Sequence, residues 1–167
     1  MNELQRISSV LAIRFARLGD VALLLPSLAY LKASFPEARL SLLTGSRCAP
    51  LARLCPHLDE VIAVDRLAMR DGPKWKALVQ IRRLVADIRS RKFDLVVDFH
   101  SFRETNLLTW MSGARYRIGM KRSDRAYLPF CFNLKPVPED KGVHVADMFR
   151  KVAESVHPVS PEIAVET

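Results

Sequence analysis

The sequence has few cysteines, few glycines and no long hydrophobic run. Its three cysteines, Cys48, Cys55 and Cys131, cannot all pair within one chain, and they form neither a C-x-x-C motif nor a Cys/His cluster with zinc spacing. We therefore expect reduced thiols, no metal site and a cytoplasmic protein. The most apolar segment, residues 21–31, contains Pro26 and is too short to span a bilayer.

Several catalytic motifs are also absent. The sequence contains no G-x-G-x-x-G motif for dinucleotides, no G-x-x-x-x-G-K-[ST] P-loop, no G-x-S-x-G nucleophile elbow and no H-E-x-x-H zinc motif. Aromatic residues make up only 8% of the chain and are not interleaved with the basic residues, so we expect no nucleic-acid binding. These absences argue against four common mechanisms and leave other chemistry open.

The composition is that of one globular domain with a basic surface. The 167 residues are 49% apolar and 26% charged, which is enough apolar material for a sizeable core. The 26 Lys and Arg residues exceed the 18 Asp and Glu residues by eight charges. Such an excess favours anionic partners, including phosphates, sugar acids and lipid surfaces, without choosing among them.

Short β-rich runs alternate with helical segments along the chain. We predict strands over 10–15, 38–43, 61–64, 93–99 and 116–120, and helices over 21–35, 50–55, 75–90, 104–111 and 144–156. Residues 134–142 are polar and rich in proline, which indicates a connection. This alternation predicts a Rossmann-like α/β domain with a doubly wound parallel sheet, and right-handed crossovers give the strand order 3-2-1-4-5.

Basic residues follow the predicted strands, together with one carboxylate, Asp20. In open parallel sheets, ligands bind outside the carboxyl ends of the strands, so these side chains are candidates for holding an anionic substrate. Each also has a simpler interpretation. Asp20 follows Gly19 at a helix start and could cap free backbone N–H groups, and Arg17, Lys121 and Arg122 could be solvated surface charges.

Residues 66–92 form the most basic segment, with nine basic residues and two acidic ones. Within it, Trp75, Leu78, Val79, Val85 and Ile88 form an apolar stripe that predicts an amphipathic helix packed on the sheet. The basic residues are then either a solvated face or a surface that adheres to an anionic membrane or a polyanionic substrate.

Three segments together resemble a known family. They are VLAIRFARLGDVALLLPSLAYLKASFPEARLSLLTGSRCAPL, FDLVVDFHSFRETNLLTWMSGARYRIGM and HVADMF. In this order and spacing they are similar to the N-terminal half of glycosyltransferase family 9, the bacterial lipopolysaccharide heptosyltransferases. The similarity covers about 10–156, nearly the whole chain.

The resemblance implies an inverting, metal-independent glycosyltransferase of GT-B architecture, in which two Rossmann-like domains face each other. Residues 1–156 would be the N-terminal domain, which binds the acceptor, the Kdo-bearing inner core of lipopolysaccharide. Residues 157–167 would begin the inter-domain linker, and the C-terminal domain that binds ADP-heptose would be absent from this chain. The implied partners are an anionic glycolipid and the surface of the inner membrane, with no cofactor.

Matched residue by residue, the resemblance implies that Asp20 is the general base. The acceptor-binding positions would be Arg14, Arg17, Gly19, Arg103, Arg125 and His144. The chain departs from the family at Phe15, Ala16 and Arg17, where small hydroxyl residues are common, and at His100 and Ser101, which replace a Gln-Gly pair. The alternative is a non-catalytic module, derived from a transferase half, that binds an anion or a glycolipid.

Overall fold

Six parallel strands form one sheet. The computed structural model describes residues 7–123 and 127–156. The strands are β1 (Ser9–Ile13), β2 (Arg39–Gly45), β3 (Glu60–Val64), β4 (Leu95–Asp98), β5 (Tyr116–Lys121) and β6 (Val137–Pro138). Their order is β3-β2-β1-β4-β5-β6, and every neighbouring pair is parallel. The predicted doubly wound sheet and its strand order are confirmed.

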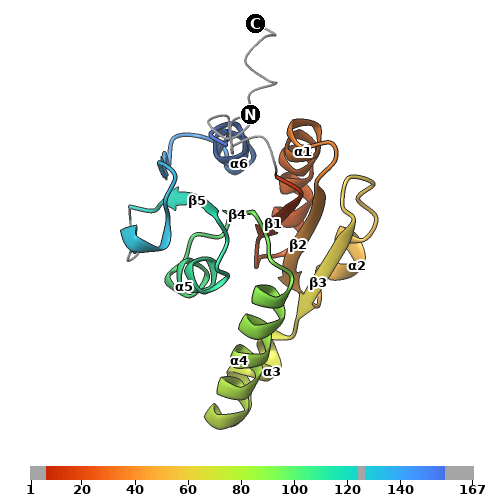
Figure 1. Ribbon diagram of the computed structural model, residues 1–167, viewed down its shortest axis with the longest axis vertical. Coiled ribbons are helices and arrows are strands. Elements are labelled where there is room, and N and C mark those ends of the chain that lie inside the picture. The colour runs from red at the N-terminus through yellow and green to blue at the C-terminus, as the bar shows by residue number, and fades with distance from the viewer. Residues whose placement is uncertain (1–6, 124–126, 157–167) are drawn as a thin grey trace, which may run out of the picture.

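Helices cover both faces of this sheet (Figure 1). One face carries α1 (Leu18–Ser34), α2 (Ala49–Ala52) and α6 (Val145–Glu154), with α1 and α6 side by side. The opposite face carries α4 (Lys74–Ser90) and α5 (Arg103–Met111), and α3 (Arg66–Asp71) lies beside α4. The result is a three-layer α/β/α domain, as the alternation of strands and helices predicts.

The central strand β1 is buried on both faces because successive side chains point in opposite directions. Val10 and Ala12 pack with α1 and α6, whereas Leu11 and Ile13 pack toward α4 and α5. All four are at most 1% exposed. The pairing of β1 with β4 places Ile13 opposite Asp98, so both strands end at the same level and their following loops lie side by side.

The structure contains two elements that the sequence pattern does not predict, the strand β6 and the helix α3. Residues 134–142 contain the short strand β6, in which Val137 pairs with Met120. Helix α3 was not predicted. It begins where the Asp65 side chain accepts a hydrogen bond from the backbone N–H of Ala68, a local cap signal that the amphipathic pattern does not contain.

The predicted apolar stripe of α4 packs on the sheet only at its C-terminal end. Ile88 is fully buried and Val85 is half-buried, but Trp75, Leu78 and Val79 are 65%, 53% and 40% exposed. The expectation that all five residues face the core is therefore wrong. A helix of this length extends about 25 Å, longer than the strands beneath it, so its N-terminal half projects beyond the sheet. In the described part of the chain, no helix has the length and apolar character needed to cross a membrane.

Gly119, in the R-I-G-M segment, marks a close approach between β5 and two neighbours. A Cβ atom there would lie 2.8 Å from a ring carbon of Phe132 and 2.9 Å from Ser101 Oγ. Ser101 Oγ cannot easily move, because it accepts a hydrogen bond from the Met120 N–H and donates one to the Asp98 carbonyl.

We therefore expect Gly119→Ala to lower the free energy of unfolding by about 1–3 kcal/mol through overpacking. The matched control is Gly45→Ala at the end of β2, where a Cβ meets nothing within 4 Å. This control should change stability by less than about 0.5 kcal/mol. Urea denaturation of the two variants measures the difference, and equal stabilities would contradict the close-packing explanation.

Candidate active site at the carboxyl edge of the sheet

A buried cation and a carboxylate meet where β1 ends. Arg14 directly follows β1 and is only 7% exposed, and its NH2 atom lies 3.7 Å from an Asp20 carboxylate oxygen. The Asp20 side chain is 33% exposed, so one side of the pair faces solvent. The sequence-predicted Arg14 and Asp20 are thus brought together by the turn between β1 and α1.

The surroundings of Arg14 fix its position. Its NH1 atom donates a hydrogen bond to the Phe99 carbonyl oxygen (3.1 Å), and its guanidinium lies 4.9 Å from the centroid of the Phe149 ring in α6. Burial lowers the pKa of Arg14, while the negative charge of Asp20 opposes this shift. An arginine pKa starts so high that the guanidinium remains charged. The contacts therefore hold a permanent positive charge behind Asp20.

Asp20 does not cap α1 as one interpretation of the sequence suggests. The N-cap residue is Arg17, which provides no side-chain cap, and Asp20 lies in the first turn, where a negative charge is favourable beside the helix dipole. Arg17 and Gly19 are exposed, and a Cβ at Gly19 would meet nothing within 4 Å. The start of α1 is therefore open to an approaching group.

A cavity of about 390 Å³ lies beside this helix start, at the ends of β2 and β3. Its lining includes Ala16, Arg47, Cys48 and Arg66. Cys48 Sγ contacts the Ala16 carbonyl oxygen at 3.1 Å, and burial together with the nearby Asp20 charge raises the pKa of this thiol. Asp20 itself is not among the lining residues. Among the described residues, no carboxylate forms an ion pair with Arg17, Arg47 or Arg66, so their charges are available to a ligand.

Asp98, at the end of β4, organises the next loop from inside the protein. Its carboxylate accepts hydrogen bonds from the backbone N–H groups of His100 (3.0 Å) and Ser101 (2.7 Å). It also accepts one from the Asn106 side-chain nitrogen (3.2 Å) when that amide is oriented with its nitrogen toward Asp98. Ser101 has a φ of 53°, in the left-handed region that is uncommon for residues with a side chain. The Asp98 carboxylate and Ser101 Oγ hold this strained turn in place.

Arg122, after β5, is occupied in the structure. It donates hydrogen bonds to the His100 carbonyl oxygen (3.0 Å) and to Glu139 (2.9 Å), and lies over the Phe102 ring. Its charge is neutralised, unlike that of a freely solvated cation. The buried His100 ring packs between Phe15 and Phe102. Arg122 and His100 thus join the loops that follow β4, β5 and β6.

The remaining predicted site residues are more peripheral. Arg103 is exposed at the first position of α5 and pairs with no described carboxylate. His144 is the exposed N-cap of α6, where its Nδ1 atom accepts a hydrogen bond from the Ala146 N–H. Arg125 lies outside the described residues. Within residues 7–123 and 127–156, no group of three His, Cys, Asp or Glu side chains has the geometry of a metal site.

Comparisons with known proteins agree with this architecture. No family model matches the chain. It is 36% identical over 112 residues to a predicted glycosyltransferase of Haemophilus influenzae, a match that covers 67% of the chain and 30% of that protein. The solved family 9 glycosyl transferase of Veillonella parvula superposes with a TM-score of 0.76 at 24% identity, covering 92% of this chain and 42% of that one.

The chain shares the fold of one half of the solved family 9 glycosyltransferases. The E. coli heptosyltransferase WaaC, solved with ADP-2-deoxy-2-fluoro heptose, has a TM-score of 0.72 at 19% identity. That alignment covers 89% of this chain and 48% of WaaC, so the chain spans less than half the length of the proteins it matches. Its α/β fold corresponds to one half of a GT-B heptosyltransferase.

Three residues that shape this site could not be recognised from the sequence: Asp98, Glu139 and Phe149. Each acts through a partner distant in sequence or through an irregular turn. Asp98 at the end of a buried strand offered one usable signal, since a carboxylate there must find hydrogen-bond donors. No local pattern indicates that Glu139 pairs with Arg122 or that Phe149 lies under Arg14.

The buried Asp98 gives a testable pH dependence. Burial raises its pKa to about 6, although hydrogen bonds from Ser101, Thr105 and His100 oppose the shift. Because the unfolded value is about 3.9, the folded state binds this proton more tightly, and the associated stability is lost as the pH rises from ~4 to ~6. Asp98→Asn keeps an acceptor oxygen and stays neutral. Relative to wild type, the variant should therefore gain about 2–3 kcal/mol between pH 4 and pH 7.5.

Urea denaturation of both proteins across this pH range measures the difference, and pH effects of other groups cancel in the comparison. A stability difference that does not change with pH would contradict a raised pKa at Asp98.

Proposed function

We propose that this chain is the acceptor-binding half of an inverting, metal-independent glycosyltransferase that transfers heptose from ADP-heptose to the Kdo-bearing inner core of lipopolysaccharide. One observation carries the proposal: a partly exposed carboxylate, Asp20, is held by a buried cation at the carboxyl edge of a sheet of this architecture. Ligands of such sheets bind at that edge. The matched E. coli protein was solved with an ADP-heptose analogue, which supports this donor class.

In the proposed reaction, Asp20 accepts the proton of an acceptor hydroxyl as the hydroxyl oxygen attacks the anomeric carbon of the donor. The new C–O bond forms as the bond from that carbon to the ADP phosphate breaks, so ADP leaves and the configuration inverts. Arg14 keeps Asp20 oriented and does not itself reach the acceptor, because its guanidinium is buried.

The exposed cations supply acceptor affinity in this proposal. Arg17, Arg47 and Arg103 project from the loops after β1, β2 and β4, and no described carboxylate neutralises them. Arginine forks match phosphate and carboxylate groups in a bidentate manner. The inner core of lipopolysaccharide bears both groups, and Gly19 leaves space for one of them at the first turn of α1.

The first test is binding. By calorimetry, the chain should bind Kdo-lipid A with an affinity that falls as salt rises, and should bind ADP-heptose weakly or not at all. Gly19→Ala should weaken Kdo-lipid A binding at least about tenfold by filling the open helix start, without lowering stability, because alanine favours helix. Tight ADP-heptose binding without acceptor binding would reverse the domain assignment.

A matched control separates stability from binding in that test. Ala33→Gly, at an exposed position near the other end of α1, should lower the free energy of unfolding by about 1 kcal/mol and leave the affinity for Kdo-lipid A unchanged. If Ala33→Gly weakens binding as much as Gly19→Ala, the open start of α1 is not the acceptor contact.

The second test is turnover in an enzyme that contains both halves. Asp20→Asn removes the proton acceptor and should lower kcat about 10²–10⁴-fold. It also leaves Arg14 without its counter-charge, so the free energy of unfolding should fall by about 1–2 kcal/mol, less than for a fully buried pair because Asp20 is partly exposed. The control Asp147→Asn, in the first turn of α6, should leave turnover unchanged.

Near-normal turnover of Asp20→Asn would leave Asp20 a structural partner of Arg14 and direct the search for the base to Glu104 or His100. Acceptor binding without turnover in the unmodified two-domain enzyme would favour the non-catalytic binding module instead.

A further inference from the structure

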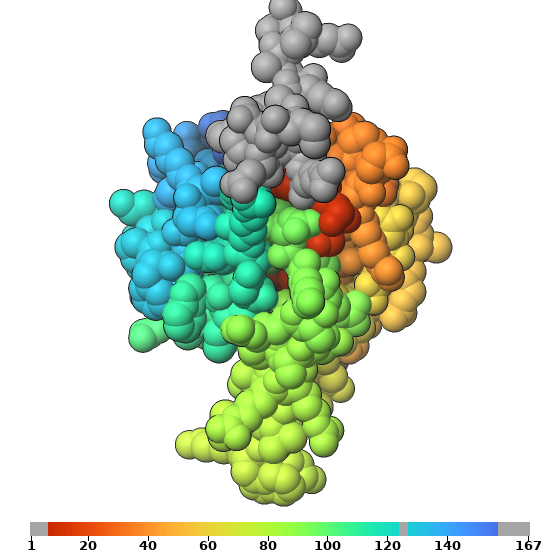
Figure 2. Space-filling view, in the orientation of Figure 1, coloured from red at the N-terminus to blue at the C-terminus, as the bar shows by residue number. Residues whose placement is uncertain are grey.

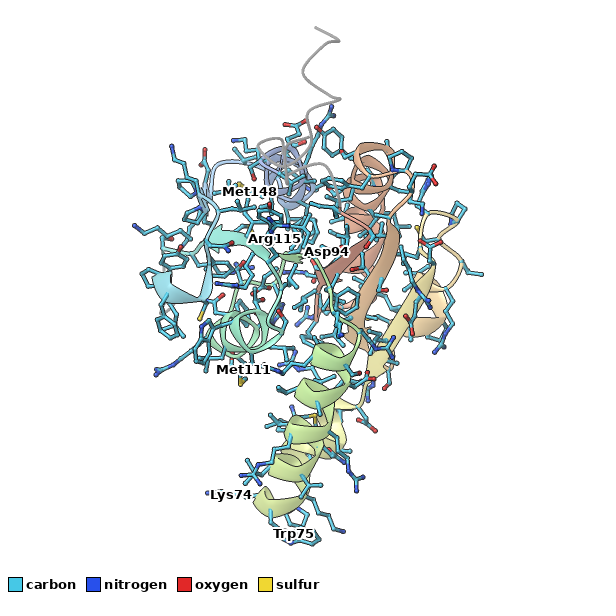
Figure 3. All side chains as sticks on the ribbon, viewed as in Figure 1. Lys74, Trp75, Asp94, Met111, Arg115 and Met148 are labelled. Carbon is cyan, nitrogen blue, oxygen red and sulfur yellow. The ribbon has the colours of Figure 1, made fainter. Side chains whose placement is uncertain are left out.

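The N-terminal half of α4 presents apolar side chains to solvent. Trp75, Leu78 and Val79 are 65%, 53% and 40% exposed. Figure 2 shows that the segment containing them protrudes from the body of the molecule, and Figure 3 places Lys74 and Trp75 at its far end. Large exposed apolar side chains gathered on one projecting element indicate a surface that binds something.

Helix geometry arranges these side chains as one patch with a basic border. Residues three and four apart lie next to each other on a helix, so Trp75 adjoins both Leu78 and Val79. At 100° per residue, Arg82 falls between these two and Arg83 beside Val79. We call these five residues, with Lys74 and Lys76 beside Trp75, the α4 patch. The Lys76 ammonium lies 5.5 Å from the centroid of the Trp75 ring.

The charges of the α4 patch are free. No described carboxylate forms an ion pair with Lys74, Lys76, Arg82 or Arg83, and residues 74–86 contain no acidic residue. Other cations of the basic segment are already engaged: Arg70 pairs with Asp71, and Arg91 pairs with Glu60 and Asp87. The uncompensated positive charge is therefore concentrated around Trp75.

We propose that the α4 patch binds the surface of a lipid bilayer that contains anionic lipids. A tryptophan and aliphatic residues on one face, bordered by lysine and arginine, are typical of helices that lie in the membrane–water interface. A protein partner fits less well, because lysine is depleted at protein–protein interfaces and two lysines flank Trp75. Four free cations around a small apolar centre instead match a layer of anionic headgroups above acyl chains.

The α4 patch lies on the same side of the molecule as the carboxyl edge of the sheet. Helix α4 runs into β4 at the amino edge of the sheet, so its opposite end projects past the carboxyl edge, where Arg14 and Asp20 lie. A bilayer bound to the patch would adjoin that edge. The inference does not depend on the proposed transferase activity, because lipid vesicles without any acceptor test it.

The experiment is vesicle flotation of the unmodified chain. Vesicles of phosphatidylcholine with roughly one quarter phosphatidylglycerol should carry the chain, and vesicles of phosphatidylcholine alone should carry much less. Trp75→Ser and the double variant Lys76→Glu/Arg83→Glu should each lower the partition coefficient at least about tenfold. Absence of flotation with the anionic vesicles would overturn the proposal.

Matched controls distinguish binding through the α4 patch from an effect of net charge and from nonspecific adsorption through any exposed tryptophan. Arg53→Glu/Lys135→Glu changes the net charge equally at exposed positions outside α4 and should keep partitioning within about twofold. Trp110→Ser replaces the other tryptophan, 49% exposed on α5, and should have little effect. Equal losses in the patch and control variants would overturn the proposal.

Two further readouts test the occupant directly. In a Trp110→Phe background, brominated lipids should quench Trp75 fluorescence, whereas the remaining Trp110 of a Trp75→Phe variant should stay unquenched. Light scattering tests the competing occupant, a second copy of the chain. A dimer that Trp75→Ser dissociates would make the patch a protein interface and overturn the proposal.

Discussion

The carboxyl edge of this sheet depends on a buried positive charge. Arg14 directly follows the central strand β1. Moving a guanidinium from water into a protein interior is costly unless the protein replaces the lost solvation. Three different elements provide that replacement: the Phe99 carbonyl after β4, the Phe149 ring of α6 and the Asp20 carboxylate of α1. The charge therefore fixes where α1 and α6 sit relative to the ends of the strands.

Charges near this edge fall into two groups. Arg14 and Arg122 are engaged by Asp20 and Glu139, and the second pair ties the loop after β5 to the loop after β6. Arg17, Arg47 and Arg103 lie farther out and have no described carboxylate partner. The paired cations give the edge its shape, whereas the unpaired ones contribute the potential that an anionic ligand meets. Substituting a paired arginine therefore changes the arrangement of the loops at this edge, whereas substituting an unpaired one changes the affinity for an anionic ligand.

Local patterns were enough to predict most of the fold, because strands buried on both faces consist of continuous apolar residues such as Val10–Ile13. The chain order of strands and helices then fixed the topology. Asp20 was located correctly at the start of a helix, but its buried partner could not be deduced, since Arg14 resembles any other cation in sequence. Glu139 escaped prediction for the same reason, because it pairs with Arg122 from another loop. Asp98 escaped prediction because it holds an irregular local turn, which no periodic pattern indicates.

Helix α4 shows where pattern reasoning has a physical limit. An apolar stripe indicates that a helix has a face to bury, but not what covers it. The short strands of this sheet cover only the C-terminal end, at Ile88, and leave Trp75 beyond the edge. At 100° per residue, Trp75 and Val79 lie about 140° and about 180° around the helix from Ile88, so the apolar residues of the two halves do not share one face. The exposed half therefore follows both from the length of the helix relative to the sheet and from this rotation of its apolar face.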